Sequence, residues 1–178
     1  MPLADKVEQR LDGALIERGE GLVEQDQPRI LQQQPGEQRA LELPGGYNPR
    51  TLALAAQWRQ EAGADDAAIV QRALDIITRD FAYTLDTPLP GRHAVDEFLF
   101  DEKQGFCEHF SSAFVVLMRG AGIPARVVTG YAGGYRNAFG DYWVVRQMDA
   151  HAWAEVWLPQ RGWVRVDPTA AVAPERIY

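Results

Sequence analysis

Apolar residues recur at helical spacing in three segments of the middle of the chain. The first helix is predicted to start at Asn48-Pro49, with Asn as the cap and Pro in the first helical position, and to end at Gly63. The second is predicted to start at Ala64-Asp65-Asp66 and to continue to about residue 80. The third opens at Cys107, and its predicted buried stripe is Phe110, Ala113, Phe114, Leu117 and Ala121.

After Gly122 the pattern changes from helical spacing to alternation. Strands are predicted in IPARVVTGYAGG, DYWVVRQM, HAWAEVWL and GWVRVD, and the loop PQR would pair Leu158 with Gly162. A short strand in FAYTL and a helical turn in AVDEFLFDEKQG precede the third helix. Because helices come first and neighbouring strands follow, the order predicts an α+β fold with a segregated antiparallel sheet.

Residues 1–46 differ in composition from the rest of the chain. They are rich in Gln, Glu and Arg and are interrupted by PGEQR and LPGGYNP. A weak helical periodicity places four apolar residues on one face: Val7, Leu11, Leu15 and Ile16. It predicts a helical N-terminal arm that packs on a domain formed by residues 47–178, and a linker without fixed structure is the alternative.

Composition and charge narrow the class of protein. With 178 residues and 46% hydrophobic residues, the chain can form one folded domain, and no apolar run approaches the roughly 18 residues of a membrane span. A membrane would therefore be reached only through segments absent from this chain. The net charge of −7, without a Lys/Arg cluster, argues against nucleic acid as a partner. One cysteine and three histidines without ligand spacing predict neither a metal nor a cofactor.

Cys107 is placed where a nucleophile can be activated. The first N–H groups of a helix have no partner inside it, and their partial positive charge stabilises a thiolate and can also bind an oxyanion. A small buried core cysteine is the alternative. His109 is two positions along the same helix and points about 200° away, so it is predicted to cap the helix or face solvent. His93 lies in a Pro/Gly loop, where an exposed, unpaired side chain is expected.

His151 and Asp167 are the remaining candidates for a base and its orienting acid. With the PQR loop, Trp153 lies opposite Asp167, which places His151 diagonal to Asp167 on the same face and within side-chain reach. Asp149 is a competing acid, two residues before His151, and Glu155 lies farther along the strand. Together the three residues would make a Cys-His-Asp acyl-transfer site.

Several motifs resemble those of the transglutaminase-like superfamily. They are GFCEHF, RGAGIPARVVTG, HAWAEVW and WVRVDPT, within about residues 48–172, and they are most similar to the extracytoplasmic domain of bacterial TgpA-type membrane proteins. The resemblance implies a papain-like core, in which the cysteine helix packs on an antiparallel sheet. It also implies Cys107 as nucleophile, His151 as base and Asp167 as orienting acid, in a domain that faces the bacterial periplasm.

The implied activity is protein-glutamine gamma-glutamyltransfer, from a glutamine carboxamide in a protein or peptide to an amine acceptor. A cysteine peptidase or amidase with the same residues, and a non-catalytic binding scaffold, are the alternatives. Animal transglutaminases place a tryptophan before the cysteine to help hold the oxyanion, and none lies between Trp58 and Cys107. Tyr83 is a candidate substitute that would contact substrate, as is Trp153 for a wall of the site, although each also fits a core aromatic. Arg126 is expected to form a buried or semi-buried ion pair rather than to bind a substrate carboxylate.

Overall fold

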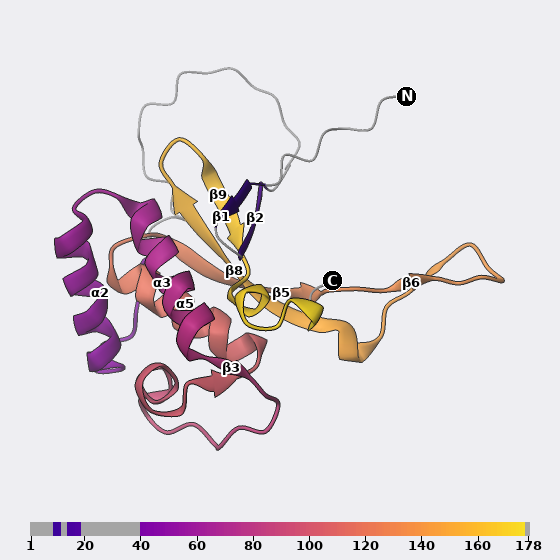
Figure 1. Ribbon diagram of the computed structural model, residues 1–178, viewed down its shortest axis with the longest axis horizontal. Helices are drawn as coiled ribbons and strands as arrows, with labels where there is room; N and C mark the ends of the chain where they lie inside the picture. Colours follow the sequence, from indigo (N-terminus) through magenta and orange to yellow (C-terminus); the bar gives the residue numbers. More distant parts are fainter. Residues whose placement is uncertain (1–8, 12–13, 19–39, 177–178) are drawn as a thin grey trace.

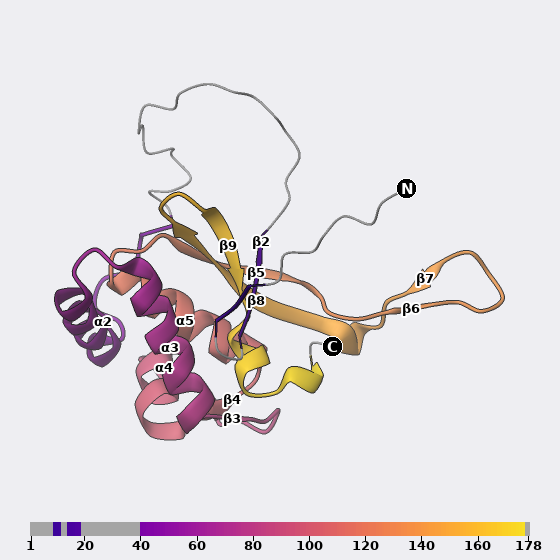
Figure 2. The ribbon, with the colours of Figure 1, turned by 45° about the horizontal axis from the view of Figure 1, so that its top comes forward.

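Helices gather on one side of a five-stranded antiparallel sheet in the computed structural model of the chain (Figures 1 and 2). The structure describes residues 9–11, 14–18 and 40–176. Its helices are α2 (Pro49–Ala62), α3 (Asp66–Asp80), α4 (Ala94–Asp96), continued by the π-helical Glu97–Glu102, and α5 (Cys107–Gly120). Short 3-10 helices span Gln147–Asp149, Pro168–Ala171 and Pro174–Arg176.

The sheet has the strand order β1-β2-β9-β8-β5. These strands are β1 (Gln9–Leu11), β2 (Ala14–Arg18), β9 (Gly162–Val166), β8 (Ala150–Leu158) and β5 (Ala125–Tyr131). Two pairs lie outside it: β3 (Ala82–Tyr83) with β4 (Gln104–Gly105), which is parallel, and β6 (Tyr135–Arg136) with β7 (Trp143–Val144), which is antiparallel. The predicted α+β class with a segregated antiparallel sheet is confirmed.

The predicted helix starts are confirmed, but one cap differs. The Asp65 side chain caps α3 by accepting from the N–H of Ala68 at 3.0 Å. Asn48 does not cap α2, because its side-chain oxygen accepts from the N–H of Val95 instead. The first N–H groups of α2 donate to the buried carboxylate of Asp96, from Thr51 at 2.8 Å. A residue 45 positions away in sequence thus satisfies the start of this helix, which no local pattern indicates.

Helix α5 is fixed against strand β8. All five residues of its predicted stripe are buried, and so are the even-numbered side chains of β8 that face the core: Ala152, Ala154, Val156 and Leu158. The buried hydroxyl of Ser111 donates to the carbonyl of Ala152 at 2.9 Å, across the contact between helix and strand. Because α5 begins at Cys107 and β8 contains His151, this packing sets the distance between the two side chains.

The register between β8 and β9 is the one that the short turn predicts. Leu158 pairs with Gly162, and Ala154 pairs with Val166, so Asp167 follows directly beyond the last paired residue of β9. Arg126 forms the predicted ion pair, with its guanidinium 2.6 Å from the Glu155 carboxylate on the neighbouring strand, but its side chain is exposed and not buried or semi-buried as expected.

The helical periodicity of the N-terminal segment is a wrong guide to its structure. Residues 9–11 and 14–18 are the strands β1 and β2, and β2 pairs with β9; Val7 lies outside the described residues. Without β2, the outer edge of β9 would leave a row of unpaired N–H and C=O groups. Pairing at that edge outweighs a weak helical pattern. The division of the chain at residue 46 stays a prediction.

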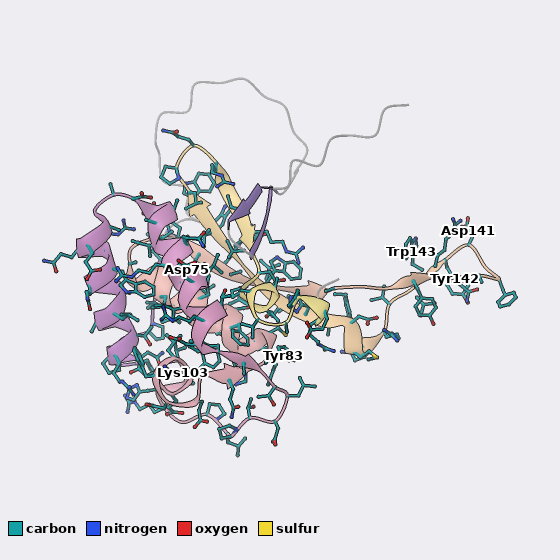
Figure 3. All side chains as sticks on the ribbon, viewed as in Figure 1. Asp75, Tyr83, Lys103, Asp141, Tyr142 and Trp143 are labelled. Atoms are coloured by element: carbon teal, nitrogen blue, oxygen red, sulfur yellow. The ribbon has the colours of Figure 1, made fainter. Side chains whose placement is uncertain are left out.

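The strand predicted over residues 141–148 is much shorter in the structure. Only Trp143–Val144 is a strand, and residues 147–149 turn into a 3-10 helix before β8 begins. β6 and β7 instead form a hairpin arm that projects from the body, with Tyr142 and Trp143 toward its far end (Figures 1 and 3). The apolar residues that suggested a half-buried strand are largely exposed there, Trp143 at 69%.

Candidate active site

Cys107 stands at the first position of α5 with a half-buried side chain. The extended residue before it, Phe106, donates its N–H to Nδ1 of His109 at 3.5 Å, so His109 caps the helix start as predicted. His93 directly precedes α4, and its Nδ1 accepts from the N–H of Asn48 at 3.0 Å. The expectation of an unpaired His93 is therefore wrong, because this nitrogen holds the turn before α2.

His151 and Asp167 form a buried pair. Nε2 of His151 lies 2.7 Å from Oδ2 of Asp167, and both residues are at most 8% exposed. The other oxygen, Oδ1, accepts from the N–H of Thr169 at 3.2 Å, since Asp167 caps the 3-10 helix that follows β9. The carboxylate is held at both oxygens, so it can fix the orientation of the imidazole ring.

The competing acids are committed elsewhere. Asp149 accepts from the N–H of Arg146 at 2.8 Å and pairs with its guanidinium at 3.0 Å. Glu155 pairs with Arg126. Asp167 is thus the carboxylate that the structure brings to His151.

Cys107 completes the arrangement at the same end of the sheet. The side chain of His151 and the N–H of Ala152 both interact with its sulfur in a way that favours the thiolate. Burial disfavours the thiolate, but hydrogen bonding by these two groups and the charge of His151 together outweigh it, so the pKa of Cys107 lies below its usual value. Burial likewise disfavours the imidazolium, yet the hydrogen bonds to Asp167 and Cys107 raise the pKa of His151 to about 9. The lowered pKa of Cys107 and the raised pKa of His151 both favour a pair of thiolate and imidazolium.

This ion pair predicts how the reactivity of Cys107 depends on pH. The lowered pKa keeps the thiolate at pH values where a free cysteine is protonated, and the imidazolium is lost only as pH rises through about 9. We expect iodoacetamide to alkylate the folded protein at pH 7 at least about tenfold faster than the unfolded chain. In His151→Ala, the midpoint of the rate profile should shift to higher pH. A profile that is the same in both proteins would contradict the pairing.

A tryptophan and an arginine support the ring from behind. The indole of Trp153 stacks on His151 with centroids 6.2 Å apart, and the guanidinium of Arg165 lies over the indole at 4.5 Å. Nη2 of Arg165 also lies 3.4 Å from Oδ2 of Asp167. Gly130 makes room for this stack, because a Cβ there would lie 2.8 Å from the indole. The sequence reasoning missed Arg165, although its place two residues before Asp167, on the same face of β9, could have indicated it.

Two cavities meet at Cys107, Ala150 and His151, which line both. The first has a volume of about 230 Å³, and its lining includes Tyr83, the glycines at the base of the arm and the C-terminal 3-10 helix. The second, of about 350 Å³, extends along β5 and β8. Tyr83 lines the first cavity together with Cys107, whereas Trp153 lines neither cavity. Trp153 stacks on His151, and the substrate contact predicted for it stays a prediction.

Neither a metal centre nor a membrane span is found in the part of the chain that the structure describes. No group of three or more His, Cys, Asp or Glu residues in it could hold a metal ion. None of its helices has both the length and the apolar character needed to cross a bilayer.

Comparisons with known proteins relate residues 53–168 to a family model described as the transglutaminase-like superfamily. Protein-glutamine gamma-glutamyltransferase from Pseudomonas aeruginosa PAO1 is 52% identical over 140 residues, which are 78% of this chain and 21% of that protein. YebA from Bacillus subtilis strain 168 is 39% identical over 140 residues, 74% of this chain and 19% of the relative. The chain thus spans about a fifth of the length of these relatives.

Solved structures agree with this relationship. The crystal structure of the periplasmic domain of TgpA from P. aeruginosa, bound to ethylmercury, is 51% identical and has a TM-score of 0.75. The match covers 80% of this chain and 51% of that one. A chain from Cytophaga hutchinsonii, 24% identical with a TM-score of 0.52, shares the fold.

Proposed function

The chain belongs to the transglutaminase-like superfamily, and we propose that it transfers the acyl group of a glutamine side chain to an amine through a thioester on Cys107. One observation carries the proposal: Cys107 lines both cavities together with His151, whose Nε2 lies 2.7 Å from Oδ2 of Asp167. The glutamine gamma-glutamyltransferase activity named for the P. aeruginosa relative supports the choice of substrate.

Acylation begins with the thiolate of Cys107, which attacks the carboxamide carbon of the glutamine side chain. The backbone N–H groups at the start of α5 stabilise the oxyanion that forms. The imidazolium of His151 then donates its proton to the leaving nitrogen, the C–N bond breaks, and ammonia departs. The products of this half-reaction are a thioester and a neutral imidazole.

Deacylation reverses the roles of the same groups. A neutral amine attacks the thioester carbon, and His151 accepts the proton that the nitrogen loses. The C–S bond breaks, an amide is released, and the thiolate–imidazolium pair is restored. Asp167 holds the ring in position through both steps and stabilises its charged form.

In this proposal Tyr83 lies at the reaction centre on the side of the first cavity. It lines the first cavity together with Cys107, and its ring lies 5.5 Å from the guanidinium of Arg176. The phenol is a hydrogen-bond donor, so it can take the part that a tryptophan plays in animal transglutaminases and help to hold the oxyanion.

The setting of the reaction follows from the same relative. The solved P. aeruginosa structure is a periplasmic domain, which supports a periplasmic site of action for this chain, with protein or peptide glutamine as donor and an amine as acceptor. No cofactor enters the proposed chemistry, because the sulfur and the imidazole supply the nucleophile and the proton transfers.

The test compares transfer with hydrolysis in one reaction. A glutamine-containing peptide is incubated with the protein and a labelled primary amine, and mass spectrometry measures the peptide products. We expect the amine adduct, with ammonia released in equal amount. Cleavage of the peptide backbone without adduct would favour a cysteine peptidase, and deamidation alone would favour an amidase. An unchanged peptide, together with no thioester on Cys107, would favour a non-catalytic scaffold.

A further inference from the structure

The two cavities at Cys107 differ in charge. Two cations and two carboxylates line the first and balance one another: Arg146, Arg176, Asp149 and Glu175. Apart from the Cys107–His151 pair, the second has one charged side chain in its lining, that of Glu108. Thr129, Gly130, Tyr131, Ala150 and Ala152 form the rest of its lining. The second cavity therefore carries a net negative charge beside the sulfur.

The carboxylate of Glu108 is uncommitted. It is exposed in the first turn of α5, and among the described residues it is in no ion pair and no side-chain hydrogen bond. Its charge also disfavours the thiolate of Cys107. Together with burial, it opposes the interactions that lower the pKa of Cys107. A carboxylate at a helix start stabilises the helix by roughly 0.3–1 kcal/mol, but so would one placed farther from the sulfur.

We propose that the second cavity receives the incoming amine and that Glu108 selects acceptors that carry a positive charge, such as a lysine side chain or a linear diamine. The inference rests on the proposed function, because it names the acceptor site of that reaction. The glutamine donor then occupies the first cavity, beside Tyr83. An acyl group held there leaves the second cavity open to the thioester.

The chemistry of this step is balanced without a further reactant. Glu108 attracts the ammonium form, which predominates at neutral pH. The ammonium loses one proton to solvent, and the neutral nitrogen attacks the thioester carbon. A C–N bond forms, the C–S bond breaks, and His151 takes the second proton. Glu108 acts through attraction, so its effect should decrease as salt increases.

The test replaces the charge without changing the shape of the side chain. Glu108→Gln is assayed with the same glutamine peptide and two acceptors: cadaverine, which is cationic, and hydroxylamine, which is uncharged at neutral pH. We expect kcat/KM for cadaverine to fall about two- to fivefold at low salt, as for an exposed charge pair, with kcat/KM for hydroxylamine unchanged. The formation of the thioester should be equal or faster, since the pKa of Cys107 falls when this charge is removed. Glu102→Gln, which changes an exposed carboxylate that lines neither cavity, is the matched control and should change the rate with neither acceptor.

The possible results separate the two claims. Equal losses for cadaverine and hydroxylamine in Glu108→Gln, or an equal loss for cadaverine in Glu102→Gln, would overturn the assignment of the acceptor site and leave the transfer reaction standing. No adduct from either amine with the unmodified protein would overturn the proposed function itself, and the acceptor site with it. A second experiment, without the glutamine peptide, measures the rates at which a cationic and a neutral methanethiosulfonate label Cys107. Glu108→Gln should reduce the ratio of the cationic rate to the neutral rate, and an unchanged ratio would count against the proposal.

Discussion

Cys107→Ala is expected to abolish amine incorporation, by about five to six orders of magnitude in kcat, while the fold is kept. The size follows from the loss of the nucleophile, because without a sulfur no thioester forms and the remaining groups act on water alone. The side chain is half-buried at a helix start and is not part of the hydrophobic core. Its truncation should therefore change the free energy of unfolding little. Adduct formation by mass spectrometry and a thermal melt measure the two effects.

Cys107→Ser is the matched control for this change. The hydroxyl has nearly the same size and can still bond to His151, but it does not ionise in the pH range of the reaction. We expect it to fold with the same melting temperature and to be almost as inactive as the alanine variant. Activity retained in either protein would mean that another group carries the acyl chain.

Local sequence patterns predicted the elements for which local preference and tertiary packing favour the same structure. Helix α5 and the β8–β9 hairpin are examples, because a buried stripe and a short turn each fix a structure with few alternatives. The same turn fixed the register that carries Asp167 to His151. Most of the candidate site could therefore be predicted from two segments and one loop length.

Other features depend on partners that are distant in sequence. Strand β2 forms at the open edge of β9, and Asp96 caps α2 from another helix, so neither can be inferred from its own neighbourhood. Alternation in residues 141–148 suggested a half-buried strand, but the projecting arm leaves those apolar residues without a sheet to cover them. Periodicity reports which residues could be buried together, and tertiary packing decides whether they are.

Asp167→Asn is expected to reduce kcat by about four orders of magnitude, with a smaller change in KM. The amide can keep the bond from the N–H of Thr169, so the 3-10 helix after β9 should persist. Toward His151 it can present an NH₂ group, which would donate to Nε2 and leave Nδ1 to donate toward the sulfur as a neutral ring. Loss of the carboxylate also removes the main support for the raised pKa of His151.

The pH profile of thiol alkylation distinguishes this role from a merely structural one. In Asp167→Asn the pKa of His151 should fall from about 9 toward its ordinary value, and the thiolate should appear only at higher pH. Asp96→Asn is the matched control, since Asp96 is also buried and accepts from the hydroxyl of Thr51 at 2.6 Å, at the start of α2. It should lower the free energy of unfolding by about 1–3 kcal/mol and leave the alkylation profile in place. If Asp167→Asn instead loses stability in the same way and keeps both its kcat and its profile, Asp167 supports the fold and does not orient the base.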